Sequence, residues 1–195
     1  MIRPLEQQFE PDKLQRIKEL ERLFESLSHQ SGAAGYFTSE IVRCLDAGLL
    51  LAALEVATSL LELFVKDLLI AARLESSASQ HRLPSFELPG NQMERKIEDV
   101  ERLYFNGMID ELANRRIIEG SDAEAIKDFY KSVRIPVHHG LTRRFIRLSS
   151  GVREDDSFAA LSLGRLGRFH KFEEVIEENS IRHLSTIVNF IGRYS

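Results

Sequence analysis

Residues 49–73 read LLLAALEVATSLLELFVKDLLIAAR, and this stretch decides the fold. Its polar side chains recur at helical spacing in one narrow stripe that comprises Glu55, Thr58, Ser59, Glu62, Lys66 and Arg73. A helix that is apolar around most of its circumference lies at the centre of a helical packing. Charged side chains inside the run would be costly at the depth of a bilayer, so we predict a buried helix rather than a membrane span.

The acidic residues of this stripe need a polar environment. Burying a carboxylate without a partner costs several kcal/mol, so unpartnered acids are not expected in a dry core. We therefore expect Glu55 and Glu62 to face cations, hydrogen-bond donors or a wet cleft.

Length and composition predict one domain over residues 1–195. The chain has 195 residues, of which 43% are hydrophobic and 29% charged, as is usual for a globular protein with a single core. Its single cysteine, Cys44, excludes an internal disulfide and a cysteine-based zinc cluster. The polar first residues lack the layout of a signal peptide, so we expect a protein of the reducing cytoplasm.

Charge is distributed unevenly along the sequence. The formal net charge is -4, yet residues 131–171 carry 9 Lys and Arg against 3 Asp and Glu, a local balance of 9 − 3 = +6. Arginine dominates this segment, and its planar guanidinium matches phosphate. The segment is either a surface for RNA or another anion, or a solvated face that pairs with the acidic helices.

Apolar periodicity predicts an all-α protein, a bundle of about five to seven helices around residues 49–73. Helices are expected from Asp12 to about Ser31, from Thr38 or Ser39 to about Gly48, from Asn91 to Tyr104, from Met108 to Ile118, from Ser121 to Val133, and over 172–191. Residues 76–90 contain two prolines and four serines and are expected to form a long loop. The pattern over 158–172 favours neither a helix nor a strand.

Several turn signals place the expected helix ends. Gly35–Thr38 and Asn106–Gly107 are typical of connections, and Gly120 suits the position just after a helix. Asn91–Glu94 and Ser121–Glu124 have the spacing of capping boxes. Pro136 predicts a helix end or a kink after Arg134, since proline lacks the N–H that a helix interior uses.

No standard catalytic motif is present. The sequence lacks a glycine-rich phosphate loop, an HExxH pair and a GxSxG elbow. Adjacent histidines such as His138 and His139 point about 100° apart on a helix, and no third metal ligand is evident. Neither a metal nor another cofactor is expected.

A pattern that leads into the start of the basic segment resembles the HEPN superfamily. It is carried by Ile117-Ile118-Glu119-Gly120-Ser121, by Phe129-Tyr130 and by Arg134-Ile135-Pro136-Val137-His138-His139-Gly140. Proteins of that superfamily are all-helical and carry an Arg, four to six intervening residues and a His, often followed by Gly. The pair Arg134 and His139 fits this spacing, whereas Arg134 and His138 does not. Ile135 stands where active members usually carry a polar residue.

The resemblance implies a metal-independent ribonuclease that acts as a homodimer, with Arg134 and His139 of both protomers at the interface. A neutral imidazole can accept the proton of a 2′-OH, and an imidazolium can protonate the leaving oxygen. Arg134 would hold the scissile phosphate. Supporting roles fall to Glu55, Glu62 and His138, and contacts with RNA or another anion to Arg143, Arg144 and Arg147.

Arg134 and His139 can meet only if the helix is interrupted. Five residues of an unbroken helix turn a side chain by about 500°, or about 140° net, so the two groups would face different ways. A break at Pro136 allows them to converge.

Other readings of the same residues stay open. Arg134 and His139 suit equally a structural ion pair beside a hydrogen-bonded histidine of the core. The chain is alternatively an inactive HEPN-like module that binds RNA, a nucleotide or a protein, or a helical interaction subunit of a toxin–antitoxin or defence system with an antitoxin-like partner.

Overall fold

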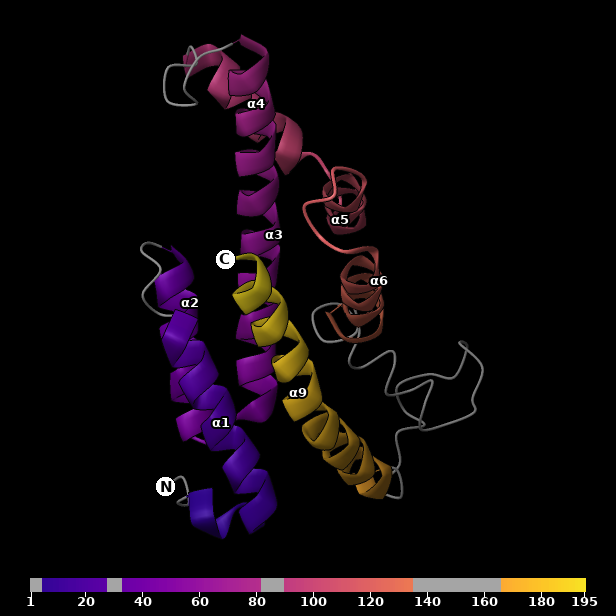
Figure 1. Ribbon diagram of the computed structural model, residues 1–195. Helices are drawn as coiled ribbons and strands as arrows, with labels where there is room; N and C mark the ends of the chain where they lie inside the picture. The colour runs from indigo at the N-terminus through magenta and orange to yellow at the C-terminus, as the bar shows by residue number, and fades with distance from the viewer. Residues whose placement is uncertain (1–4, 28–32, 82–89, 135–165) are drawn as a thin grey trace, which may run out of the picture.

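The computed structural model describes residues 5–27, 33–81, 90–134 and 166–195, with side chains undescribed at 33, 76–81, 90–93, 96, 132, 134 and 166–178 (Figure 1). Its elements are η1 (Leu5–Gln7), α1 (Pro11–Leu27), α2 (Ala33–Asp46), α3 (Leu50–His81), α4 (Gly90–Glu101), α5 (Phe105–Asn114), α6 (Gly120–Phe129), a π-helical turn η3 (Tyr130–Arg134) and α9 (Leu166–Tyr194). The described residues contain no strand. The predicted all-α fold is therefore confirmed.

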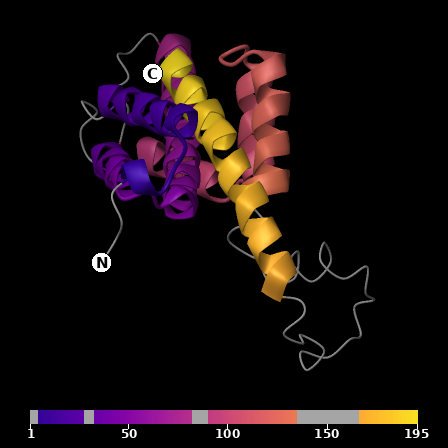
Figure 2. The ribbon, with the colours of Figure 1, turned by 90° about the horizontal axis from the view of Figure 1, so that it is seen from below.

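Helix α3 is the axis on which the other described helices pack. It contacts α2, α4, α5 and α9. Figure 1 shows α1 and α2 on one side of it, α5 and α6 on the other, and α9 crossing in front. In the view of Figure 2, α9 runs between the α1–α2 pair and the α5–α6 pair. The prediction of a buried central helix is confirmed.

The central helix is longer than predicted. It continues to His81, so residues 76–81 are helical and the expected loop over 76–90 is wrong for that part. Serine lowers helix propensity only slightly, and extending an existing helix costs little compared with starting one. The first proline after the helix is Pro84, and residues 82–89 lie outside the described ones.

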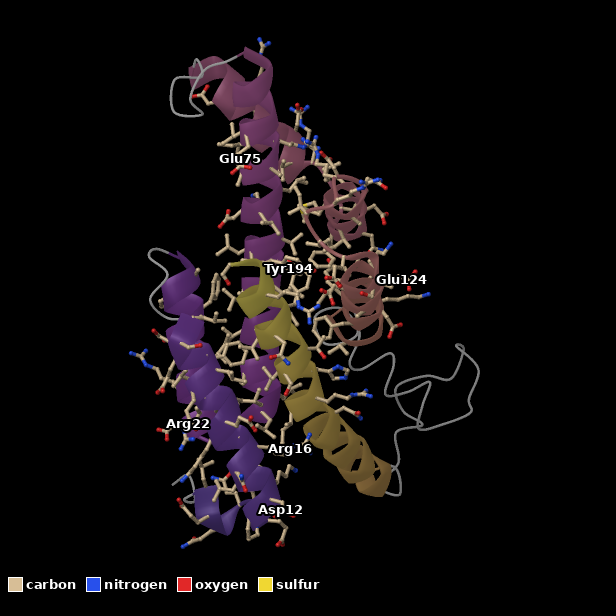
Figure 3. All side chains as sticks on the ribbon, in the orientation of Figure 1. Asp12, Arg16, Arg22, Glu75, Glu124 and Tyr194 are labelled. Carbon is tan, nitrogen blue, oxygen red and sulfur yellow. The ribbon has the colours of Figure 1, made fainter. Side chains whose placement is uncertain are left out.

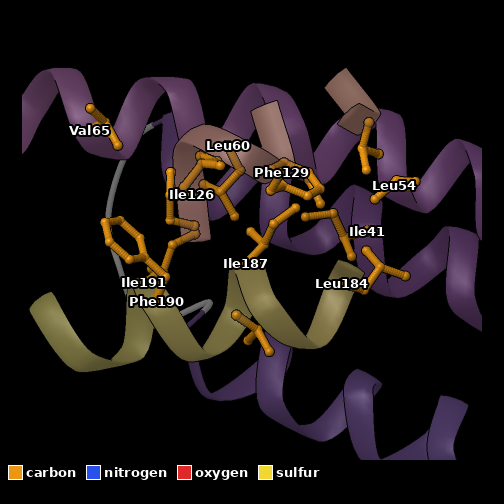
Figure 4. Packing of buried hydrophobic residues seen from close by; sticks show 14 of the residues in the cluster. Ile41, Leu54, Leu60, Val65, Ile126, Phe129, Leu184, Ile187, Phe190 and Ile191 are labelled. Atoms are coloured by element: carbon orange, nitrogen blue, oxygen red, sulfur yellow. The ribbon is translucent and has the colours of Figure 1, made fainter. Parts of the chain in front are cut away.

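The core is a single cluster of aliphatic and aromatic side chains from α1, α2, α3, α5, α6 and α9. In Figure 4, Ile41 of α2, Leu54 and Leu60 of α3, and Ile187 of α9 converge on one another; all four are at most 1% exposed. Full burial of such a side chain contributes about 1.5–3 kcal/mol. Helix α9 therefore covers one apolar side of α3, which would otherwise be exposed to water.

The ends of α2, α5 and α6 differ from the predicted ones. Gly35–Thr38 lies inside α2, where the Thr38 hydroxyl donates to the carbonyls of Ala34 at 3.1 Å and Gly35 at 3.0 Å instead of capping a helix. Asn106–Gly107 lies inside α5, and Gly120 is the first residue of α6. The chain turns between α5 and α6 at Arg116, whose φ is 59°.

Burial of Ile118 explains the early end of α5. This side chain is 3% exposed and belongs to the core cluster, although it lies in the connection between the two helices. If α5 continued through Ile117 and Ile118, helical geometry would fix the direction of the Ile118 side chain. The observed turn instead lets this side chain enter the core. Tertiary burial outweighs the local pattern at this point.

A cluster of hydrogen bonds ties the end of α9 to the start of α6. Tyr194, labelled in Figure 3, lies at the end of α9. Its hydroxyl donates to Asp122 Oδ2 at 2.6 Å and accepts from the Glu119 N–H at 3.0 Å. Arg193 donates to the same carboxylate oxygen at 2.7 Å. Burial, followed by the hydrogen bond to Asp122, raises the pKa of Tyr194. The α5–α6 pair is thereby anchored to the closing helix.

The turn from α2 into α3 requires a glycine. The Leu49 N–H donates to the Cys44 carbonyl at 2.8 Å and the Gly48 N–H to the Leu45 carbonyl at 2.9 Å, a Schellman motif with Gly48 at φ 72°. A β-carbon at Gly48 would lie 2.6 Å from Gln8 Oε1 and 3.1 Å from carbons of both Leu5 and Phe9. The predicted end of this helix at about Gly48 is confirmed.

We expect Gly48→Ala to lower the free energy of unfolding by about 1–2 kcal/mol, because an L side chain is strained at positive φ and the N-terminal segment must also move. Urea unfolding followed by circular dichroism measures the change. Gly107→Ala is the matched control: nothing lies within 4 Å of its β-carbon position in α5, and we expect a gain of about 0.5–1 kcal/mol there. Equal effects of the two substitutions would contradict the assignment of the turn.

The packing of α9 on α6 includes a half-buried histidine. The His183 ring lies 5.6 Å from the Phe129 ring, centroid to centroid. Burial, reinforced by the charge of Arg182 and opposed by that of Asp128, lowers the pKa of His183 from 6.5 to about 4. The imidazole is therefore neutral near pH 7 and acts as part of the packing.

This shift predicts a dependence of stability on pH. The folded protein binds the proton less readily than the unfolded chain, so the stabilisation is complete above about pH 6.5 and declines as the pH falls towards 4. Because solvent screens the half-buried ring, we expect a loss of about 1–2 kcal/mol over that range. Urea unfolding of the wild type and His183→Gln between pH 7 and 5 measures it. The same slope in both proteins would contradict the assignment.

Candidate functional site

The motif that carries the HEPN resemblance falls mainly outside the described residues. Arg134 is the last residue of the π-helical turn η3, and its side chain is not described. Pro136, His138 and His139 lie outside the described residues, as do Arg143, Arg144 and Arg147. The expected convergence of Arg134 and His139 across Pro136 stays a prediction.

The two acidic residues expected to support the motif lie in different environments. Glu55 is exposed on α3, whereas Glu62 is half-buried and lines a cleft, one of the environments expected for it. Two turns of helix separate the two residues along the same stripe. Glu62 lines this cleft, and Glu55 is not among its lining residues.

This cavity, here called the aromatic cleft, has a volume of about 450 Å³. Its characteristic lining side chains are Phe37, Glu62, Lys66, Tyr104, Phe105 and Tyr130. They come from α2, α3, the start of α5 and the π-helical turn, so four separate segments build the wall. A volume of this size lies within the range of small-molecule and cofactor pockets.

Helix α3 supplies the polar wall of the cleft by its periodicity. Ser59, Glu62, Leu63 and Lys66 all line it, at positions i, i+3, i+4 and i+7 of one helical face. These are members of the polar stripe that the sequence analysis identified, together with one leucine. The stripe therefore points at a cavity where neighbouring helices leave α3 uncovered.

The opposite wall is aromatic. The rings of Phe105 and Tyr130 stack with centroids 4.1 Å apart and planes 7° apart. Phe105 is 5% exposed and fixed in the core, whereas Tyr104, next to it in the sequence, is 90% exposed. The cleft thus combines a fixed aromatic stack with one ring that stands in solvent.

The position of Tyr104 differs from the prediction. The sequence predicts a helix from Asn91 to Tyr104, but α4 ends at Glu101 and Tyr104 lies in the short connection before α5. Its backbone is extended, with φ −70° and ψ 152°. The sequence did contain a signal for this position, the aromatic pair Tyr104-Phe105 followed by Asn106–Gly107. In an extended segment, neighbouring side chains point to opposite sides, so one ring of such a pair is buried while the other is exposed.

Charges at the cleft are organised around Lys66. Its ammonium donates to Glu101 Oε1 at 2.7 Å, which links the cleft wall to the end of α4. One carboxylate oxygen of Glu62, Oε1, is shielded from solvent. The cleft wall therefore carries the Glu62 carboxylate near the Lys66 ammonium, which forms an ion pair with Glu101.

A half-buried ion pair holds α5, and with it the aromatic wall, against α3. Arg73 donates to both carboxylate oxygens of Glu111, at 2.9 and 2.5 Å, and Arg115 donates to Oε1 at 3.0 Å. The hydrogen bond from Arg73 is the main cause that lowers the pKa of Glu111. A bidentate pair of this kind fixes orientation as well as distance. It orients the helix that carries Phe105 and Met108.

Two further properties bear on the chemistry. The described residues contain no group of three or more His, Cys, Asp or Glu side chains placed to hold a metal ion. No described helix combines the length and apolar character needed to cross a membrane.

Comparison with known proteins adds no relative. No protein-family model, no curated protein and no solved structure matches the chain.

Proposed function

We propose that the chain is a HEPN-like, metal-independent endoribonuclease that uses Arg134 and His139 at a homodimer interface. The spacing of the two residues, the Gly140 that follows them and the all-helical bundle support this proposal. The observation that carries it is the π-helical turn Tyr130–Arg134, which begins at a residue lining the aromatic cleft and ends at the motif arginine. Single π-helical turns are frequent at functional sites.

The proposed reaction is an internal transfer at phosphorus. The neutral imidazole of His139 accepts the proton of the ribose 2′-OH, whose oxygen forms a bond to phosphorus while the bond to the 5′-oxygen breaks. An imidazolium, the His139 of one or the other protomer, returns a proton to that leaving oxygen. Arg134 binds the phosphate and stabilises the charge that develops on it. The products are a 2′,3′-cyclic phosphate and a 5′-hydroxyl.

A second candidate function is RNA or nucleotide binding without cleavage. The aromatic cleft favours this candidate, because exposed Tyr104, next to the Phe105–Tyr130 stack, offers an aromatic ring on which a base can stack. Stacking of this kind binds RNA without cleaving it. Ile135, directly after Arg134, also suits this candidate. An RNA incubation in EDTA separates the two functions: cleavage supports the ribonuclease, and retention without cleavage supports the binding module.

We expect Arg134→Ala and His139→Ala each to reduce cleavage of a labelled RNA in EDTA by at least about 100-fold, because each removes a group that stabilises the transition state. The melting temperature should change little, and His138→Ala should have a smaller effect on cleavage. Arg102→Ala is a matched control, since this exposed arginine of the α4–α5 connection pairs only loosely with Glu98, at 3.7 Å. If the His139→Ala protein cleaved RNA like the wild type, or if it did not fold, the catalytic role would be rejected. Arg134 and His139 would then form a structural pair.

The proposed active site also requires two chains. We expect light scattering to give a particle of about 45 kDa, twice the chain mass of 22.3 kDa, because a two-fold axis brings two copies of one motif together. Mixing Arg134→Ala with His139→Ala protein tests the shared site: recovery of part of the cleavage is expected only if one protomer complements the other. A stable monomer of about 22 kDa with full activity would contradict the dimeric site.

A further inference from the structure

Aromatic rings from three separate segments line the aromatic cleft. Phe37 belongs to α2, Tyr104 and Phe105 lie at the start of α5, and Tyr130 belongs to the π-helical turn. Tyr104 is 90% exposed, and Phe37 and Tyr130 are half-buried, so part of each of these three rings is accessible to a ligand. Phe105 is 5% exposed and supports the Tyr130 ring by stacking on it.

The basic side chain of the lining is neutralised by an ion pair. Lys66 is the basic residue among the described side chains that line the cleft, and its ammonium donates to Glu101 Oε1 at 2.7 Å. This pair leaves little positive charge directed into the cleft. An anionic ligand would have to displace Glu101 from Lys66, whereas a cation meets no such competition.

The segments that build the cleft are acidic as a whole. Residues 33–81, 90–114 and 130–134 comprise α2, α3, α4, α5 and the π-helical turn. They carry 8 Lys and Arg against 12 Asp and Glu, a balance of 8 − 12 = −4. A field of this sign raises the local concentration of cations and lowers that of anions.

Accessible aromatic rings and a negative potential together suit a methylated ammonium group. The face of an aromatic ring is the negative part of its quadrupole and attracts a cation. A quaternary ammonium has no N–H, so it requires ring faces rather than a hydrogen-bond acceptor in the wall. A primary ammonium is more strongly hydrated and loses more when it leaves water.

We propose that the aromatic cleft binds a quaternary ammonium group, with the rings of Tyr104, Phe37 and Tyr130 against the cation. The volume of about 450 Å³ leaves room for the rest of the ligand. The group belongs either to a small molecule such as choline or to a trimethylated lysine of a protein. This ligand class goes beyond the proposed ribonuclease, because neither Arg134 nor His139 is among the described residues that line the cleft.

Three small ligands separate charge from shape. Choline carries a trimethylammonium cation, 3,3-dimethyl-1-butanol has carbon in place of its nitrogen, and ethanolamine has hydrogens in place of its methyl groups. Titrations followed by protein NMR at fixed ionic strength give the three Kd values. We expect the Kd of choline to be at least about five-fold lower than that of either analogue, because only choline combines positive charge with weak hydration.

Two substitutions at one position separate attraction to a ring face from apolar contact. Tyr104→Leu keeps an apolar side chain but removes the ring, so we expect the Kd of choline to rise about five-fold, whereas Tyr104→Phe should stay within about two-fold of the wild type. Tyr36→Leu is the matched control, because Tyr36 is 65% exposed on α2 and is not among the lining residues. If Tyr104→Leu does not fold, as judged by circular dichroism, choline and its neutral analogue in the wild type decide.

Three results would overturn the proposal: no saturable binding of choline, equal affinity for choline and 3,3-dimethyl-1-butanol, or binding of choline by Tyr104→Leu like that of the wild type. Tighter binding of adenosine 5′-monophosphate than of choline would also reject it and favour the nucleotide-binding candidate, since both ligands would cover Tyr104. If choline binds as expected, a short peptide that carries trimethyllysine identifies the source. Tighter binding of the peptide indicates a methylated protein, and equal or weaker binding indicates a small molecule.

Failure of the cleft and failure of the proposed ribonuclease are distinguishable. Arg134→Ala should lose cleavage of RNA and keep the affinity of the cleft for choline. Cleavage without binding of choline would reject the cation site alone, and binding of choline without cleavage would reject the ribonuclease alone.

Discussion

The burial of α3 is the constraint on which the rest of this structure depends. A helix with apolar side chains around most of its circumference must be covered on several sides, and no single neighbour can do that. Here α2, α9 and α5 each cover one part, and α9 arrives from the far end of the chain to close the front. The arrangement of the described helices follows from this requirement.

The same constraint creates the cleft. Neighbouring helices bury the apolar faces of α3, and the half-buried face with Ser59, Glu62 and Lys66 lines the cleft. Burying polar side chains of a central helix costs free energy unless they reach water or hydrogen-bonding partners. The aromatic cleft therefore lies where the polar stripe of α3 needs access to water. The gap is then framed by α5, which the Arg73–Glu111 pair holds in a defined orientation.

The chain beyond the cleft connects this framework to the proposed chemistry. Tyr130 contributes to the wall, and the π-helical turn that begins there ends at Arg134. A π-helical turn rotates the following residues relative to an α-helix, which changes the direction in which the chain leaves α6. The proposed RNA-directed function would use the aromatic wall, the arginine-rich sequence and the Arg134–His139 spacing together.

The sequence by itself determined the helical class and the central helix, because these depend on periodicity over many residues. The bend at Gly48 was also predictable, since glycine is the residue that accepts positive φ without strain. The tertiary structure alone decided the early end of α5 and the exposure of Tyr104. Ile118 leaves the helical pattern to enter the core, and the turn that permits this depends on contacts distant in the sequence. The aromatic cleft likewise exists only because four segments meet, so no local pattern could place Glu62 opposite Tyr130.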